Sequence, residues 1–250
     1  MTRRLLLLAL LLFGGMPANA EHPAECRVAE NLTVPNFRLP RVAKALAEKR
    51  LTILVLGAGS SQLPGSSGTR NAYPARLQQA LAQRLPGVDV KVTTDVKSRR
   101  TAVEMVKILP NDLGAAKPDL LIWQTGTVDA MLAVDPDVFS QALDKGINIA
   151  HSEGADVVLI NSQYSPRTES MIALSTYGDD MRWVALQHEV PLFDRFNVMK
   201  LWSDLGTFDL YSATKKLDIA EQVHDCIGRL LADLVVTAAK SQELPTNGSR

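Results

Sequence analysis

Two adjacent serines at the end of an apolar run are the residues of this sequence best suited to chemistry. Ser60 and Ser61 follow residues 51–57 (LTILVLG) within the segment GAGSSQ, residues 57–62. A dinucleotide-binding turn would need a third glycine where Gln62 stands, and the lysine of a phosphate-binding Walker loop is missing. A tight strand-to-helix connection is the plain alternative. Together with a histidine near the C-terminus, the serines indicate a nucleophile for acyl transfer.

The elements around the serines alternate between buried strands and amphipathic helices. Short runs rich in Val, Ile and Leu, separated by helical patterns, predict a parallel sheet that is covered on both faces. The expected strands are 51–57, 88–94, 119–124, 156–161 and 190–193, and the expected helices are 73–85, 102–113, 136–151, 170–188 and 217–238. We therefore expect a single three-layer α/β/α domain with a five-stranded parallel sheet. Ligands bind at the carboxyl ends of parallel strands, so the residues after each strand form the candidate site.

The serine segment resembles the first sequence block of the GDSL/SGNH hydrolases. In that family a strand runs into Gly-Asp-Ser-x-x-x-Gly. Residues 59–61 (GSS) and Gly65 match this block, with Ser60 in place of the aspartate, and Ser61 falls on the nucleophile. The resemblance follows the order of the elements from residue 51 to about residue 234. It implies a flavodoxin-like SGNH hydrolase fold and ester hydrolysis through an acyl-enzyme on Ser61, without a cofactor.

The positions that would bind the oxyanion depart from the family. Residues 126–130 (GTVDA) resemble the third block, Gly-x-Asn-Asp, but Val128 stands where the family has its asparagine donor. Residues 97–101 (KSRRT) lie where the second block has a glycine N–H donor, and they contain no glycine. One lost donor typically costs ~10²–10³ in rate. The N–H of Ser61 remains, and the candidate replacements are backbone N–H groups near Arg99 and Arg100 or the side chains of Gln124, Thr127 and Gln163.

The resemblance also places the general base after the fifth strand, where His224 is the only histidine. The family pattern there is Asp-x-x-His. Glu221 precedes His224 by three residues, which puts both side chains on one face of a helix. We expect His224 to accept the Ser61 proton and Glu221 to orient the imidazole. Asp225 and Asp209 are alternative acids.

A second interpretation of the C-terminal region makes the site inactive or altered. Residues 209–212 (DLYS) fit the location of the family pattern but end in Ser212 rather than histidine. In that case His224 is an ordinary helix residue. His151 and His188 lie late in helices that precede strands, so they are expected at the edge of the sheet opposite Ser61.

The loop after the fourth expected strand, residues 161–169, also lies at the carboxyl edge. Gln163 and Thr127 are candidate oxyanion or substrate-binding residues there. Arg167 would suit an anionic or sugar-bearing substrate, with a solvated arginine as the plain alternative. The histidines are scattered and no Cys-x-x-Cys or His-x-x-x-His occurs, so we expect no metal.

The first twenty residues have the parts of a secretory signal peptide. Arg3 and Arg4 precede the apolar residues 5–13, and residues 18–20 (ANA) form a small-residue cleavage site. We expect cleavage after Ala20 and export to the periplasm or the medium. An uncleaved anchor is the alternative, although the apolar run is shorter than the ~20 residues of a membrane span.

Export bears on whether the two cysteines form a disulfide. In an oxidising compartment Cys26 and Cys226 are expected to form a disulfide that ties the N-terminal arm to the last helix. Two independent thiols are the alternative. A cysteine count of two also excludes a Cys₄ zinc site and a small disulfide-dense fold.

Composition narrows the class of protein further. The chain of 250 residues is 46% hydrophobic and 22% charged, which suits a packed core. It carries 27 basic and 27 acidic residues, so the electrostatic case for a nucleic-acid partner is absent. The expected organisation is a signal peptide (1–20), an N-terminal arm (21–50), the hydrolase-like domain (51–240) and a polar tail (241–250).

The sequence therefore predicts an exported SGNH-type serine hydrolase. Its substrate would be a small acyl or acetyl ester, or an acylated glycan of the cell envelope, and no membrane span is expected after cleavage. The alternative is a catalytically silent SGNH-fold module that binds envelope polysaccharide.

Overall fold

The computed structural model describes residues 22–211 and 216–240 of the chain. The expected signal peptide, Ser212 and the expected C-terminal tail lie outside the described residues.

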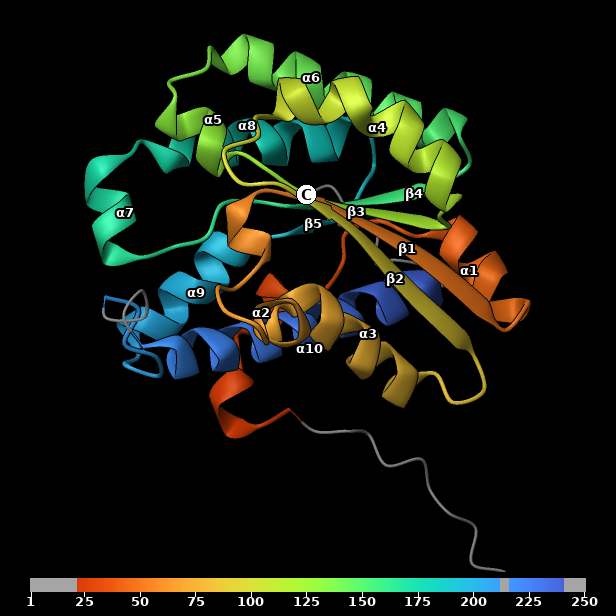
Figure 1. Ribbon diagram of the computed structural model, residues 1–250, viewed down its shortest axis with the longest axis horizontal. Helices are drawn as coiled ribbons and strands as arrows, with labels where there is room; N and C mark the ends of the chain where they lie inside the picture. Colours follow the sequence, from red (N-terminus) through yellow and green to blue (C-terminus); the bar gives the residue numbers. More distant parts are fainter. Residues whose placement is uncertain (1–21, 212–215, 241–250) are drawn as a thin grey trace, which may run out of the picture.

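Five parallel strands form the central sheet, as the sequence predicts (Figure 1). They are β1 (Arg50–Gly57), β2 (Asp89–Val96), β3 (Leu120–Gln124), β4 (Asp156–Ile160) and β5 (Leu192–Phe193), in the order β2-β1-β3-β4-β5. The strands β3 and β4 are buried along their whole length. A strand with both faces covered has no solvent side, which is why these runs are continuously apolar rather than alternating.

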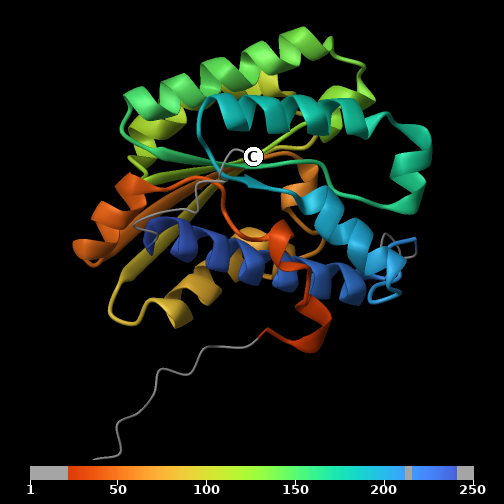
Figure 2. The same ribbon diagram turned by 180° about the vertical axis from the view of Figure 1, so that it is seen from behind.

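Helices cover both faces of the sheet (Figures 1 and 2). One layer consists of α4 (Ala102–Ala116), α5 (Thr127–Met131), α6 (Pro136–Ser152) and α8 (Leu174–Gln187). The other layer consists of α1 (Pro40–Ala47), α2 (Gly68–Asn71), α3 (Tyr73–Arg84), α9 (Arg195–Asp204) and α10 (Leu217–Lys240). The short α7 (Pro166–Met171) lies at one end of the sheet. Each helical layer packs against one face of the sheet, and a separate apolar core lies between each layer and the sheet.

Local signals account for two of these helices. Asp135 caps the start of α6 by accepting from the N–H groups of Asp137 and Val138, and Pro136 follows as the first helical residue. A glycine is required on the same helix, because a Cβ at Gly146 would lie 2.3 Å from the ring of Trp123. In α4, Thr101 and Glu104 form a capping box.

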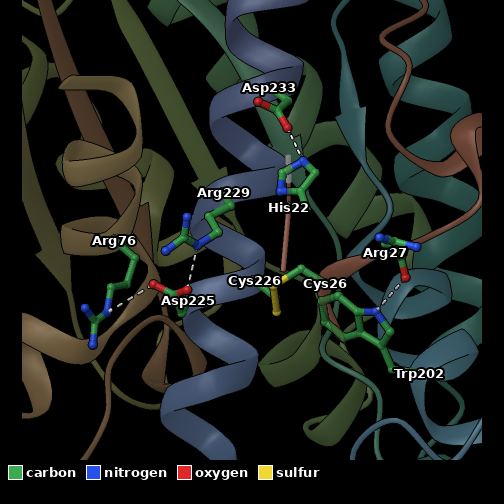
Figure 3. Close-up of a disulfide and its surroundings, with 9 residues drawn as sticks. All are labelled: His22, Cys26, Arg27, Arg76, Trp202, Asp225, Cys226, Arg229 and Asp233. Atoms are coloured by element: carbon green, nitrogen blue, oxygen red, sulfur yellow. Dashed lines mark hydrogen bonds and ion pairs between the residues drawn. A yellow bond between two sulfur atoms is a disulfide. The ribbon is translucent and has the colours of Figure 1, made fainter. Parts of the chain in front are cut away.

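The N-terminal arm is more ordered than expected. It contains α1 and two short 3₁₀ turns, Ala24–Cys26 and Glu30–Leu32. The predicted disulfide joins Cys26 to Cys226 across 200 residues of sequence (Figure 3). Nearby, His22 pairs with Asp233 and the Trp202 indole donates to the Arg27 carbonyl at 3.3 Å. These contacts fix the arm against α9 and α10.

Three expectations about elements need correction. The predicted helix 170–188 is two helices, α7 and α8, and the helix α9 was not predicted. Strand β2 lies one to two residues later than residues 88–94.

None of the helices in the described ranges is both long enough and apolar enough to cross a membrane.

Candidate active site

The two serines form a 3₁₀ turn, Gly59–Ser61, directly after β1 at the carboxyl edge of the sheet. Ser61 is only 1% exposed, whereas Ser60 is partly exposed. The turn folds back so tightly that a Cβ at Gly57 would lie 2.4 Å from Ser61 Oγ. The glycine at the end of β1 is therefore what allows the serine to pack there.

Gln124, at the end of β3, organises both serines. Its Oε1 accepts hydrogen bonds from the Ala58 N–H (3.1 Å), Ser60 Oγ (3.1 Å) and Ser61 Oγ (2.8 Å). A backbone N–H can only donate, so the bond from Ala58 fixes the amide with its oxygen toward the serines. Both serine hydroxyls consequently direct their protons at Gln124.

The remaining contact of Ser61 is with Tyr73, whose hydroxyl lies 2.9 Å from Ser61 Oγ. Because the Ser61 proton is committed to Gln124, the tyrosine hydroxyl is the donor in this pair. Burial raises the pKa of Tyr73, which keeps the phenol protonated for this role. Ser61 thus donates one hydrogen bond and accepts one in a nearly closed environment.

Ser60 accepts from Arg195 instead. Nη2 of Arg195 donates to Ser60 Oγ at 3.0 Å, and Nη1 donates to the Ser60 carbonyl at 3.2 Å. The arginine is 1% exposed, and its Nε has no hydrogen-bond partner within the described chain. Burial lowers the pKa of Arg195 to about 10, so the guanidinium remains charged near neutral pH. No motif of the sequence marks Arg195; the available signal is its position two residues after β5, at the carboxyl edge of the sheet.

His224, on α10, is 7% exposed and faces the start of α3. Its Nδ1 accepts the backbone N–H of Tyr73 at 3.0 Å, so a side chain satisfies one of the free donors of that helix end. The neutral imidazole must then carry its proton on Nε2. Burial first, and the charge of Arg195 second, lower the pKa of His224 to about 3.

This geometry differs from the expected triad. A general base needs a free lone pair on Nε2 and a proton on Nδ1 that an acid can accept. Here Nδ1 is the acceptor. The carboxylate of Glu221 accepts from Asn71 Nδ2 at 2.8 Å, and Asp225 pairs with Arg229 at 2.7 Å. The structure therefore brings neither Glu221 nor Asp225 to the position of an orienting acid.

A cavity of about 350 Å³ opens beside Ser60 and His224. Its apolar lining residues are Leu63, Pro64, Met199, Leu210, Leu217, Ala220 and Val223. Gln163, a candidate oxyanion or substrate-binding residue, also lines it. Ser61 borders a different hollow, between α3 and β2, and its hydroxyl is engaged with Gln124 and Tyr73. Of the two serines, Ser60 is the one that faces the apolar cavity.

The other predicted binding residues, Thr127 and Arg167, do not line this cavity. Thr127 is 9% exposed, and its Oγ1 has no hydrogen-bond partner within residues 22–211 and 216–240. Arg167 is exposed, with its guanidinium 5.4 Å from the centroid of the Tyr211 ring. Within the described residues, no three His, Cys, Asp or Glu side chains are grouped to hold a metal ion.

The aspartate of the segment that resembles the third block, residues 126–130, has a structural role. Asp129 is fully buried and accepts from the N–H groups of Ala102 (2.9 Å) and Gly126 (3.2 Å) and from the Thr125 hydroxyl (3.2 Å). Burial raises the pKa of Asp129, and these hydrogen bonds oppose that shift. The carboxylate joins the starts of α4 and α5, which sets the loop beside the site.

His151 and His188 lie where the sequence predicts, at the amino edge of the sheet. They border a cavity that also includes Asp156 and Pro191. His188 Nε2 lies 2.7 Å from Asp144 Oδ1.

Comparisons with known proteins agree with this architecture. The model of the non-GDSL lipase-like family matches residues 25–241. No curated protein matches the sequence at a significant level.

Solved structures of the same fold include three hydrolases of low sequence identity. A catalytic mutant of the acetylxylan esterase Axe2 from Geobacillus stearothermophilus is 16% identical, with a TM-score of 0.58 over 76% of this chain and 94% of that one. A lipase/acylhydrolase from Enterococcus faecalis is 20% identical, with a TM-score of 0.54 over 72% and 97%. The enzyme LAE5 from the metagenome of Lake Arreo, Spain, is 17% identical, with a TM-score of 0.54 over 76% and 94%. The predicted SGNH-type fold is confirmed.

Proposed function

We propose that this chain, which belongs to the non-GDSL lipase-like family, is an ester hydrolase that places an apolar acyl group in the cavity beside Ser60 and His224. One observation carries the proposal. Ser60, just after β1, lines a cavity that is apolar along most of its wall, and polar side chains such as Gln163 and His224 complete the lining. Ligand sites of this kind combine an apolar wall with a few placed polar groups.

The reaction would proceed through an acyl-enzyme on one of the two serines. The family resemblance favours Ser61 as the nucleophile, and access from the cavity favours Ser60. The serine oxygen attacks the ester carbonyl, the alcohol leaves, and water releases the acid. The apolar wall favours an acyl chain longer than acetyl. A glycan of the cell envelope as the alcohol part is a prediction from the sequence alone.

His224 would act in this site as a donor rather than as a base. Its Nδ1 is occupied by the Tyr73 N–H, so the Nε2–H is the group available on the ring. A neutral N–H beside the serines could stabilise the oxygen of a substrate carbonyl, in place of the donors missing at Val128 and in residues 97–101.

Export of the protein is a further part of the proposal. The disulfide between Cys26 and Cys226 supports it, because disulfides persist in oxidising compartments outside the cytosol. The N-terminal sequence supports it independently, since residues 1–20 have the parts of a signal peptide.

A catalytically silent binding module is the second candidate. Two contacts favour it: the Ser61 hydroxyl is fully engaged, and Nδ1 of His224 is bound to a backbone N–H instead of donating to an acid. In such a module the cavity would bind an acylated ligand without cleaving it.

An ester panel and a fluorophosphonate probe distinguish the two candidates. The mature wild-type protein would be tested on p-nitrophenyl esters of increasing chain length, beside the double variant Ser60→Ala/Ser61→Ala. Turnover by the wild type and its loss in the double variant would support the enzyme. A folded wild type that binds a fatty-acyl ligand but shows neither turnover nor labelling would support the silent module.

A further inference from the structure

We propose that Ser60 is the acyl acceptor of this site and that the buried guanidinium of Arg195 stabilises the negative charge on its oxygen. The inference rests on the proposed function and specifies it, because it names the reacting atom and the group that activates it. The contact between Arg195 Nη2 and Ser60 Oγ, at 3.0 Å, carries the argument.

The charge of Arg195 is unusual for its position. Buried charges are normally paired with an opposite charge, because moving an ion out of water is costly. Arg195 is 1% exposed, and none of the ion pairs within the described residues includes it. Its Nη1 and Nη2 donate to the two oxygen atoms of Ser60, and its Nε has no hydrogen-bond partner within the described residues. A buried cation without a counter-ion favours an anion that forms beside it.

The hydroxyl oxygen of Ser60 is the atom on which such an anion can form. It lines the apolar cavity, so an ester carbonyl can approach its Oγ. Ser61 is placed differently, because its Oγ accepts from a neutral tyrosine hydroxyl and is nearly excluded from solvent. The two serines share Gln124 Oε1 as the acceptor of their protons. They differ in the group that donates to them, which is Arg195 for Ser60 and Tyr73 for Ser61.

The two steps of ester hydrolysis use only water and hydroxide from the solvent. A hydroxide ion at the cavity takes the Ser60 proton and becomes water, and the serine oxygen then attacks the ester carbonyl carbon. The new C–O bond forms as the carbonyl π pair moves onto oxygen; the bond to the alcohol breaks, and the alkoxide takes a proton from water. In the second step hydroxide attacks the acyl carbon, the bond to Ser60 Oγ breaks, and the oxygen leaves as an anion beside Arg195. It then takes the proton of the carboxylic acid, which departs as a carboxylate.

The charged and titratable groups that face the serines come from three helices. Arg195 extends from α9, Tyr73 begins α3, and His224 lies on α10. Tyr73 and His224 are both neutral near pH 7, because burial raises the pKa of the first and lowers that of the second. Arg195 is therefore the charged group among these three near pH 7, and it is the one that can stabilise an anion at position 60.

A cysteine in place of Ser60 measures this effect without requiring turnover. The two native cysteines are joined in the disulfide, so Ser60→Cys introduces the single free thiol of the chain. Its alkylation rate by iodoacetamide, followed against pH, gives the thiol pKa. We expect a value at least about one unit below the ordinary value of ~8.5, and Arg195→Met in the same background should raise it by about one unit or more.

Two matched variants complete this test. Ser61→Cys should react at least about 100-fold more slowly than Ser60→Cys, since reactive thiols sit in electropositive, partly exposed surroundings. Arg195→Lys retains the charge and should keep part of the shift, which separates the charge from a packing defect of the methionine variant. An ordinary pKa in Ser60→Cys, unaffected by either arginine variant, would overturn the proposal.

Mapping the adduct of a fluorophosphonate probe by mass spectrometry tests the same claim in the native chain. We expect the adduct on Ser60, with a labelling rate that falls at least about tenfold in Arg195→Lys. An adduct on Ser61 together with intact ester turnover would overturn this inference and leave the proposed function standing. Absence of both label and turnover in a folded wild type would instead remove the proposed function, while the thiol titration would still show whether Arg195 acts on position 60.

Discussion

The backbone N–H of Tyr73 donates to Nδ1 of His224 at 3.0 Å, and this bond decides what the histidine can do. It joins the first turn of α3 to the N-terminal third of α10 and fixes the ring with its proton on Nε2. The same α3 residue donates its hydroxyl to Ser61. One tyrosine therefore holds both the histidine and the serine that the sequence predicts as partners, through two different groups.

The burial of His224 predicts a dependence of stability on pH. Its folded pKa, about 3, lies below the unfolded value of about 6.5, so the unfolded chain binds more protons between these values. Stability from this group is then fully present above about pH 6.5 and falls as the pH drops toward 3. We expect the free energy of unfolding of the wild type to fall more steeply than that of His224→Gln between about pH 6.5 and 4.5.

Urea unfolding at several pH values measures this difference. The glutamine variant keeps a side-chain oxygen that can accept a hydrogen bond, but it has no proton to gain. Taking the difference between the two proteins cancels the carboxylates that titrate in both. Parallel curves would contradict the buried neutral histidine.

Replacement of Glu221 tests the expected acid of the triad. In the structure its carboxylate accepts from Asn71, so Glu221→Gln should change ester turnover by no more than about twofold. Removal of a true orienting carboxylate lowers turnover by about 10⁴ in a serine protease. Steady-state kinetics with one p-nitrophenyl ester decide between these outcomes, and Asn71→Ala serves as the control for loss of the same hydrogen bond.

The fold followed from the sequence more readily than the site did. The runs that form β1, β3 and β4 are apolar and bounded by turns, and such local patterns predict strands. The proline and aspartate at the start of α6 are local signals too. The break between α7 and α8 falls at residues 172–173 (IA), where neither a glycine nor a proline marks it, so residues 170–188 suggest one helix.

The site depends on contacts between distant residues, which no local pattern reports. Ser60 and Arg195 are 135 positions apart, and Tyr73 and His224 are 151 apart. The family resemblance pointed to the serines because they carry a local motif. It could not reveal that a backbone N–H occupies the imidazole or that an arginine stands beside the first serine.

The disulfide should contribute strongly to stability. It closes a loop of 200 residues, and in the chain-entropy model a loop of this length corresponds to about 5 kcal/mol, with typical measured values of about 2–4 kcal/mol. We expect Cys26→Ser/Cys226→Ser to lose about 2–5 kcal/mol of unfolding free energy. Guanidinium unfolding with and without a reducing agent measures this, and the double variant should be insensitive to the reductant.

Helix α10 approaches α3 closely at a glycine, and this contact sets the distance between His224 and Tyr73. A Cβ at Gly228 would lie 2.6 Å from Arg76 Cβ and 2.8 Å from the Leu77 nitrogen. Gly228→Ala should therefore destabilise the protein by about 1–3 kcal/mol, the usual cost of overpacking. Gly114→Ala is the matched control, because nothing lies within 4 Å of its Cβ and alanine favours helix by up to about 1 kcal/mol. Thermal unfolding of both variants should give shifts of opposite sign.

The apolar cavity predicts how the enzyme selects acyl chains. Ala220 lines the cavity from α10, and a larger side chain there would fill space that we assign to the acyl group. We expect Ala220→Phe to lower kcat/KM for octanoate esters at least about tenfold, since losing the burial of two or more methylenes costs about 0.8 kcal/mol each, while acetate esters change by less than about threefold. Ala47→Phe, an exposed position on α1, is the control and should leave both substrates unaffected. Equal losses for acetate and octanoate would place the acyl chain elsewhere.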